Sequence, residues 1–267
     1  MTLILKLLPI KEIIFPIVES LGNWCRFTWF TLEWTCRPPF RWKNIFRQMQ
    51  FIGVQSLPII LLTGLFSGMV FALQTGKTFA LFKMQNLVGS TVALALTREI
   101  GPVFTSLMVT ARVGSAMAAE IGTMKVTEQI DALYTMAVDP IQYLVTPRML
   151  GCVFMVPLLT IVFDYIGCVG AYIVGIGLLD IPSGPFLRHL YWYVDPEDIF
   201  GGMLKAVVFG FCLSMISCYR GFKTEGGAEG VGRATTGAVV ASSVTILIVD
   251  YFLTTWILEY FVPGRHH

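Results

Sequence analysis

Residues 48–76 read QMQFIGVQSLPIILLTGLFSGMVFALQTG and contain no charged side chain. A transmembrane helix needs about 20 consecutive, mostly apolar residues. This stretch is therefore long enough and apolar enough to cross a bilayer. Shorter uncharged runs recur at 149–163, 206–219 and 234–249. The pattern predicts an all-α integral membrane protein.

Composition agrees with this class. Only 13% of the 267 residues are charged, whereas soluble domains carry about 25%. The formal net charge of +2 and the lack of a basic tract do not favour nucleic-acid binding. The six cysteines form no CxxC pair, so we expect free thiols and no metal site.

Residues 1–47 mix charged side chains with many tryptophans and phenylalanines. Amphipathic segments rich in aromatic and basic residues tend to lie in the membrane interface. We therefore expect an interfacial helix at about 9–36, within an N-terminal cytoplasmic region of residues 1–47. The transmembrane domain, 48–260, should hold five spanning helices, at 48–74, 87–118, 148–179, 200–219 and 235–259.

The lysines and arginines are distributed unequally about these spans. Twelve lie in segments 1–47, 119–148 and 220–233, and four lie in the segments on the opposite side. Because basic residues accumulate in cytoplasmic loops, the N-terminus should be cytoplasmic and the C-terminus should lie outside the membrane.

The second span contains an unusual charged pair in LALTREIGPVFTSL, residues 94–107. Arg98 and Glu99 are adjacent, and only helical neighbours three or four residues apart share a face. Each charge must therefore find its partner elsewhere. Pro102 has no N–H, so the carbonyl of Arg98 should lose its helical partner and the helix should kink at Gly101 and Pro102. This combination predicts the wall of a polar cavity.

Two further charged residues, Lys205 and Asp250, should lie at a similar depth on the outer side. Charged residues at a helix centre cost about 2.5–3.5 kcal/mol each on insertion scales and are often functional. We expect Arg98, Glu99, Lys205 and Asp250 to line one cavity, whose two cations suit a phosphodiester. The alternative is a structural network that joins Lys205 to Asp250, and Arg98 to Glu99 of a neighbouring subunit. The role of Asp164, in the third span, stays open.

The segment between the second and third spans reads GTMKVTEQIDALYTMAVDP. Thr127, Glu128 and Gln129 resemble a helix start, and Asp139-Pro140 a helix end. A short acidic helix here is the expected form of a peg that docks into a partner. A plain amphipathic loop helix is equally compatible with the pattern.

Two glycine patterns remain. The glycine-rich loop expected at 220–233 matches neither GxxxxGK[ST] nor GxGxxG, so we predict no nucleotide site in this chain. Small residues also repeat at helix-packing spacing in Gly64-xxx-Gly68, Gly114-xxx-Ala118 and Gly167-xxx-Ala171-xxx-Gly175. Such steps let helices approach closely, within one subunit or between two.

Several of these stretches together resemble the MlaE (YrbE) family of ABC permeases. They are LTREIGPV, ARVGSAMAAEIGTMKVTEQIDAL, MAVDP, TPR at 146–148 and GRATTGAVV. The resemblance covers nearly the whole chain. It implies a homodimer with one interfacial helix and five spans per subunit, in the bacterial inner membrane, with the C-terminus in the periplasm.

The resemblance also implies partners and a substrate. A separate cytoplasmic ATPase dimer would bind ATP and Mg, so this chain would carry no cofactor and no catalytic residue. A periplasmic MCE-domain ring would exchange phospholipid with the permease, in a system that maintains outer-membrane lipid asymmetry. The family's charged pocket residues fall on Arg98, Glu99 and Lys205.

The family's coupling helix falls on Thr127 to Leu133. This helix includes Gln129, and its acids Glu128 and Asp131 would contact the ATPase.

Two other classes of function compete with an ABC permease. An ion-coupled secondary carrier would use Glu99, Asp164 or Asp250, but the inverted repeats usual in such carriers are not visible. A lipid-modifying enzyme is disfavoured, because the chain has no HxxxxD motif and no paired-Asp motif.

Overall fold

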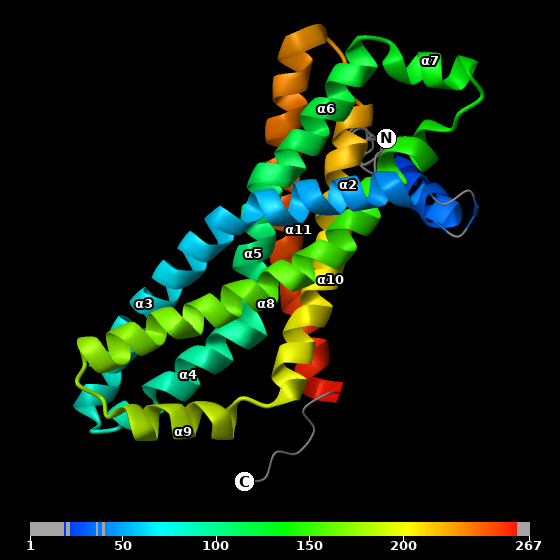
Figure 1. The fold of residues 1–267 in the computed structure, drawn as a ribbon. Helices are drawn as coiled ribbons and strands as arrows, with labels where there is room; N and C mark the ends of the chain where they lie inside the picture. The colour runs from blue at the N-terminus through cyan, green and yellow to red at the C-terminus, as the bar shows by residue number, and fades with distance from the viewer. Residues whose placement is uncertain (1–18, 20–21, 36, 39–40, 261–267) are drawn as a thin grey trace, which may run out of the picture.

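The computed structural model describes residues 19, 22–35, 37–38 and 41–260 (Figure 1). These residues form helices joined by short turns, with no strand among them. Residues 22–35 are helical and belong to the predicted interfacial helix, whose first part, 9–18, lies outside the described residues.

The remaining elements follow in chain order. They are α2 (Trp42–Gly53), η1 (Val54–Ser56), α3 (Leu57–Leu81), η2 (Gln85–Leu87), α4 (Val88–Ala95), η3 (Leu96–Ile100), α5 (Gly101–Val109), η4 (Thr110–Gly114), α6 (Ser115–Val126), α7 (Gln129–Thr135), η5 (Ile141–Val145), α8 (Thr146–Gly177), α9 (Ser183–Tyr193), α10 (Pro196–Phe222) and α11 (Gly227–Tyr260). The segments η3, η4 and η5 are π-helical, whereas η1 and η2 are 3₁₀ turns.

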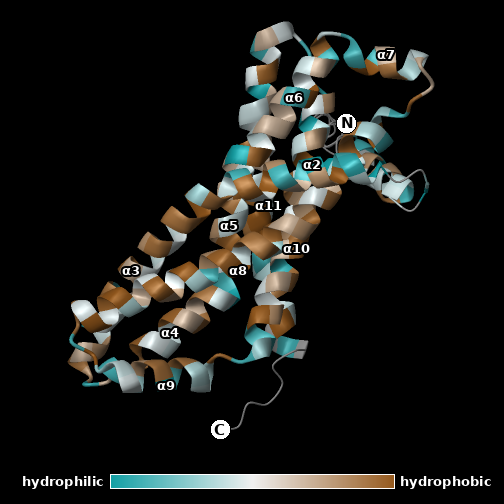
Figure 2. Cartoon of the chain, viewed as in Figure 1, coloured by the Kyte–Doolittle hydropathy of each residue, from teal (hydrophilic) through white to brown (hydrophobic). Residues whose placement is uncertain are grey.

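In the described part of the chain, five helical runs are long and apolar enough to cross a membrane, which confirms the predicted class. They are Trp42–Leu81, Gln85–Val126, Ile141–Gly177, Pro196–Phe222 and Gly227–Ile257. Each run begins or ends several residues beyond the predicted span, because helical hydrogen bonding continues through polar residues at its ends. Figure 2 shows apolar residues along the middle of these helices and polar residues gathered towards α7 and the turns.

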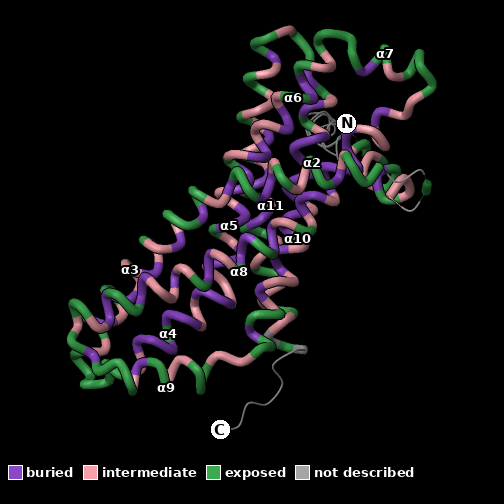
Figure 3. The backbone as a smooth tube through the Cα atoms, viewed as in Figure 1, coloured by how far each residue is buried: buried purple, intermediate pink, exposed green. Residues whose placement is uncertain are grey.

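α8 lies at the centre of the helix arrangement. It packs against α3 and α2 on one side and against α10 on the other, while α11 packs against α10 and α6. Figure 3 shows that α8 and α10 carry long buried stretches. α3 and α11 have outward-facing apolar side chains, such as Phe66 (56% exposed) and Tyr251 (69% exposed).

The small-residue repeats pack helices of the same chain against one another. A Cβ added to Gly68 would overlap the backbone of Gly167, and one added to Gly64 would lie 2.6 Å from Cγ2 of Ile166. Gly175 similarly faces the ring of Phe186 on α9. Within the described residues, these glycines therefore set the close approach of α3 and α9 to α8, rather than a contact between subunits.

The predicted glycine-rich loop is wrong over most of its length. α10 continues to Phe222 and α11 already begins at Gly227, so the turn is confined to 223–226. Gly226 (φ 87°) and Gly227 (φ 70°) adopt the left-handed conformation that this tight turn requires. α11 therefore begins before residue 235, where the fifth span is predicted to start, because a helix tolerates glycines when its neighbours pack.

Two other segments differ from expectation. The connection between the predicted third and fourth spans, which end at 179 and begin at 200, contains α9, and α9 packs against α4. The short helix between the second and third spans ends at Thr135, not at Asp139-Pro140. Asp139 instead accepts a hydrogen bond from the N–H of Ile141 at 2.8 Å, so it marks the start of the third span.

Candidate ligand site

The second span is interrupted where its charged pair lies. α4 ends at Ala95, the π-helical segment Leu96–Ile100 follows, and α5 begins at Gly101 with Pro102 in its first turn. In Figure 1 the span changes direction between α4 and α6. Pro102 has no N–H to donate, so the carbonyl of Arg98 is free to accept a hydrogen bond from another helix.

Lys205 of α10 supplies that hydrogen bond. Its ammonium nitrogen Nζ lies 3.0 Å from the carbonyl oxygen of Arg98. Nζ also lies 2.6 Å from Oε2 of Glu99 and 2.7 Å from Oγ1 of Thr254. A lysine ammonium has three N–H donors, so these contacts satisfy Lys205, which is only 2% exposed.

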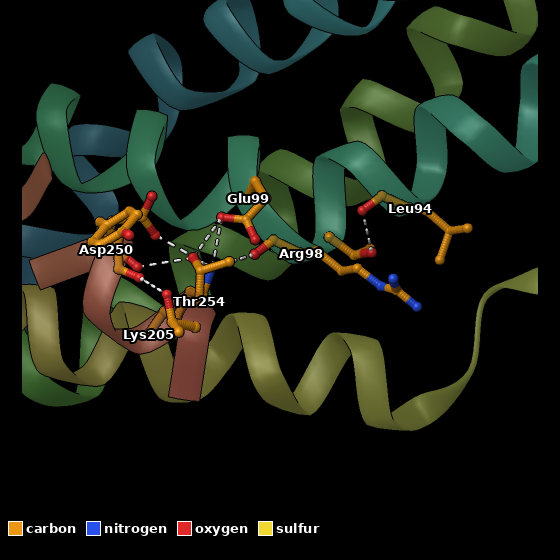
Figure 4. Close-up of polar contacts among 9 residues, drawn as sticks. Leu94, Arg98, Glu99, Lys205, Asp250 and Thr254 are labelled. Atoms are coloured by element: carbon orange, nitrogen blue, oxygen red, sulfur yellow. Dashed lines mark hydrogen bonds and ion pairs between the residues drawn. The ribbon is translucent and has the colours of Figure 1, made fainter. Parts of the chain in front are cut away.

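Asp250 and Thr254 bring α11 into the same cluster. Oδ1 of Asp250 forms an ion pair with Nζ of Lys205 at 3.3 Å, although its geometry is not that of a hydrogen bond. The hydroxyl of Thr254 lies 3.2 Å from Oε2 of Glu99 and 2.8 Å from the carbonyl oxygen of Asp250. Figure 4 shows Lys205 between Glu99, Asp250 and Thr254. We call Glu99, Lys205, Asp250 and Thr254 the Lys205 cluster.

Arg98 points away from the Lys205 cluster (Figure 4). Its Nε donates to Oδ1 of Asp198 at 2.8 Å. The Asp198 side chain is 2% exposed and the Arg98 side chain 32%. Within the described residues, the two terminal nitrogens of the Arg98 guanidinium have no protein acceptor, so they are available to a ligand.

Asp198 is held by the start of its own helix. Asp195 and Asp198 form a capping box at the N-terminus of α10, in which Oδ2 of Asp198 accepts the N–H of Asp195 at 3.2 Å. Gly202, one turn later, lets α10 approach the carbonyl of Thr97 closely. The first turns of α10 therefore position both Asp198 and Lys205 against the π-helical segment.

The ion pairs in the structure differ from those of the alternative structural network predicted from the sequence. Lys205 pairs with Asp250, as in that network, but Lys205 also pairs with Glu99. Arg98 pairs with Asp198 in the same chain. Asp198 and Thr254 are not among the residues predicted from the sequence. The Asp195-Pro-Glu-Asp198 capping pattern signals the position of Asp198, whereas only its spacing from Asp250 relates Thr254 to the cluster.

Asp164 lies on the other side of the bent span. Asp164 is only 9% exposed, and its carboxylate oxygen Oδ1 is buried without a hydrogen-bond partner among the described residues. A Cβ added to Gly101 would overlap this oxygen. Asp164 also lines an apolar groove of about 430 Å³ between α8, α9 and the start of α10, so it is separate from the Lys205 cluster.

Arg112 is bound by the first span. Its Nη1 donates to the Phe51 carbonyl at 3.2 Å and to Ser56 Oγ at 2.9 Å, and its Nη2 donates to Gln55 Oε1 at 2.6 Å. These acceptors surround the 3₁₀ turn between α2 and α3. Arg112 therefore stabilises the junction of α2 with α3.

The residues predicted for coupling gather around α7. Thr127 ends α6, and Glu128 (φ 59°) takes the left-handed conformation just before α7 begins at Gln129. Ile130 is 1% exposed, and Leu133 packs against the core. Asp131 is 56% exposed at its side chain and forms an ion pair with Lys125 at 3.2 Å. α7 thus holds the exposed acid Asp131 beside the buried apolar side chain of Ile130.

No group of three or more His, Cys, Asp or Glu side chains within the described ranges could hold a metal ion. The fold and the site together define a multi-pass helical membrane protein, with an ion cluster between its second, fourth and fifth spans. The family model described as Permease MlaE matches residues 45–256. The chain therefore belongs to the MlaE permease family.

Relatives along most of the chain support this assignment. The probable ABC transporter permease protein RP096 of Rickettsia prowazekii (strain Madrid E) is 47% identical over 236 residues, which cover 88% of this chain and 91% of the relative. The probable ABC transporter permease protein slr1045 of Synechocystis sp. (strain ATCC 27184 / PCC 6803 / Kazusa) is 42% identical over 216 residues, 81% of this chain and 82% of the relative.

A plant relative is also similar. Protein TRIGALACTOSYLDIACYLGLYCEROL 1, chloroplastic, of Arabidopsis thaliana is 39% identical over 218 residues, which cover 82% of this chain and 62% of the relative. The family and these relatives support a permease subunit of an ABC transporter.

Proposed function

We propose that this permease moves phospholipids between the bacterial inner membrane and the periplasm or outer membrane. One observation carries the proposal: a polar ion cluster lies beside an uncovered apolar helix face. Glu99 and Asp250 keep side-chain exposures of 42% and 20% although they pair with Lys205. An amphipathic lipid requires adjacent polar and apolar surfaces of this kind. The plant relative's name, which contains that of a galactolipid, supports a lipid substrate.

The uncovered face belongs to α11. Its exposed side chains are Val240, Val244, Leu247, Ile248 and Tyr251, which follow one another at helical spacing. Asp250 and Thr254 flank this stripe. We infer that a second copy of the chain covers this stripe and encloses the ion cluster, which gives a homodimer with a lipid cavity between its subunits.

Within that cavity the two cations have different roles. Lys205 is satisfied by protein acceptors and keeps Glu99 and α11 in position. The terminal guanidinium N–H groups of Arg98 have no acceptor in the described part of the chain, and such groups suit bidentate binding of a phosphodiester. In this proposal Arg98 contacts the headgroup, and Lys205 maintains the polar wall.

The energy source lies in a partner. We infer a cytoplasmic ATPase dimer that binds ATP and Mg, docks on α7, and moves the second span through α6. The exposed acids Glu128 and Asp131 support this placement. The excess of basic residues in 1–47 and 119–148 supports a cytoplasmic N-terminus. An MCE-domain ring would exchange lipid on the periplasmic side.

The test uses the chain co-expressed with its genomic neighbours and extracted gently from the membrane. Native mass spectrometry should find two copies of this chain, two copies of an ATPase subunit and bound phospholipid. In proteoliposomes, movement of labelled phospholipid should require ATP. An Arg98→Gln variant should retain less lipid, whereas Lys77→Gln, at an exposed position near the end of α3, should retain as much as the wild type. Transport without any ATPase would overturn the proposal in favour of an ion-coupled carrier.

A further inference from the structure

A second polar cavity lies far from the Lys205 cluster. It has a volume of about 400 Å³, and its lining includes Asn44, Arg47, Gln48, Glu120, Tyr143 and Arg148. Glu99 and Glu120 lie on the same span, about 30 Å apart along the helix at 1.5 Å per residue. This cavity therefore lies towards the opposite membrane surface, where α2, α6 and α8 meet.

The cavity is rich in hydrogen-bond donors. Arg148 is 6% exposed and is held by Glu120 (2.8 Å, from Nη2) and by the Leu144 carbonyl (2.8 Å, from Nη1). Its Nε has no hydrogen-bond partner among the residues described. Arg47 is exposed, and its guanidinium has no ion pair or hydrogen bond with any residue that the structure describes.

Only one acid balances these cations. Glu120 is the sole acidic side chain among the described residues that line the cavity, and Arg148 already occupies it. Arg41 adds a third cation beside the lining residue Tyr143, with its guanidinium 4.7 Å from the centroid of the tyrosine ring. The excess of positive charge and N–H donors suits an anion with several oxygens, and arginine binds phosphate oxygens well.

Helix α2 forms one wall of the cavity and indicates the depth of the cavity in the membrane. Asn44, Arg47 and Gln48 share one face of α2 and line the cavity. Trp42 (63% exposed) and Phe46 (64% exposed) lie on the opposite face. Exposed tryptophans at the end of a span mark the headgroup level of a bilayer. The polar face of α2 is thus turned inward, at the depth of lipid headgroups.

We propose that this cavity is a binding site for a phosphate-bearing anion, supplied by the headgroup of an anionic phospholipid in the adjacent leaflet. Basic pockets between transmembrane helices bind such headgroups. The proposal rests on the membrane placement of α2 and not on transport of lipid through the Lys205 cluster. Arg47 is the expected phosphate contact, and the buried Arg148 adds positive charge to the cavity wall.

The test measures lipid binding to the purified, delipidated protein in detergent by native mass spectrometry. The probes are phosphatidylglycerol, phosphatidylcholine and inorganic phosphate. Phosphatidylglycerol should bind more tightly than phosphatidylcholine. Arg47→Gln should weaken phosphatidylglycerol binding about fivefold, the effect expected for one basic side chain near an anionic surface. Arg47 is exposed, so this variant should fold.

Lys43→Gln is the matched control. It makes the same charge change at an exposed position of the same helix, but Lys43 does not line the cavity. It should leave phosphatidylglycerol affinity within about twofold of the wild type. An equal loss in both variants would overturn the site in favour of general surface attraction. Displacement of the lipid by inorganic phosphate would overturn the proposal that a lipid headgroup occupies the cavity. Loss of ATP-driven transport in Arg98→Gln, with this binding unchanged, would bear only on the proposed function.

Discussion

The ammonium of Lys205 lies 3.0 Å from the backbone carbonyl of Arg98 and 2.6 Å from the carboxylate of Glu99. One side chain of α10 therefore satisfies both the carbonyl that Pro102 leaves free and the acid beside it. The contact fixes the bent second span against α10. The same ammonium forms ion pairs with the carboxylates of both Glu99 and Asp250, so one cation balances two acids between the spanning helices.

Replacing Lys205 by Met should destabilise the protein by roughly 3 kcal/mol, at the lower end of the range for breaking a buried ion pair. The lower end applies because Glu99 is 42% exposed. Thermal unfolding in detergent would measure the loss. Adding Glu99→Gln and Asp250→Asn to Lys205→Met should recover much of it, since no unpaired acid would remain. A Lys205→Met variant as stable as the wild type would contradict the buried pairing.

Replacing Asp198 by Ala should also destabilise the fold, by about 2 kcal/mol, because Asp198 both accepts from Arg98 and completes the capping box of α10. Asp198→Asn should cost less, since its amide oxygen can still accept the N–H of Asp195. The two unfolding temperatures give the comparison. Equal losses would mean that the capping interaction contributes little.

Gly101→Ala should be destabilising, because the new Cβ would overlap Oδ1 of Asp164 and approach the carbonyl of Leu96 to 2.9 Å. Asp164→Ala would remove the first of these overlaps. The double variant should therefore be more stable than the sum of the single effects predicts, by about 0.5–3 kcal/mol, the usual range for contacting residues. Strict additivity in the unfolding free energies would show that the two residues do not meet.

Gly68→Ala should separate α3 from α8, because its Cβ has no room beside the Gly167 backbone. Overpacking of this kind costs about 1–3 kcal/mol. Gly177→Ala is the control, since nothing lies within 4 Å of its added Cβ. The proteins should differ in unfolding temperature, with Gly177→Ala close to the wild type. Similar decreases in the unfolding temperature of both variants would show that helix propensity, and not packing against α8, causes the change.

Glu128→Lys combined with Asp131→Lys should uncouple ATP hydrolysis from transport while the protein still inserts. Transport per ATP should fall about tenfold, which corresponds to losing about 1.4 kcal/mol of docking free energy. Lys125→Ala removes the Lys125–Asp131 ion pair without changing either acid, and it should keep coupling because exposed pairs contribute little. Unchanged lipid-stimulated turnover in the reconstituted complex of the double variant would refute the docking role of α7.

The membrane class followed from sequence because uncharged runs of this length are rare outside membrane-spanning helices. The freed carbonyl of Arg98 could likewise be predicted, since it depends only on the missing N–H of Pro102. The partner of Arg98 could not, because Asp198 lies on another helix and chain spacing does not show which helices touch. The glycine-rich segment was misjudged because glycine weakens an isolated helix, whereas packing against α10 and α6 keeps 227–260 helical.

The π-helical segment Leu96–Ile100 also sets the rotation of the rest of the second span. A π turn holds one more residue than an α turn, and each helical residue turns the chain by about 100°. Residues Gly101 to Val109 are therefore rotated relative to an unbroken helix that begins at Val88, and the second π-helical segment, Thr110–Gly114, adds a further rotation before α6. The first offset lets Glu99 face α10 and α11 while Val109, at the end of α5, remains in the core. The alignment thus depends on the number of residues in this turn as well as on their side chains.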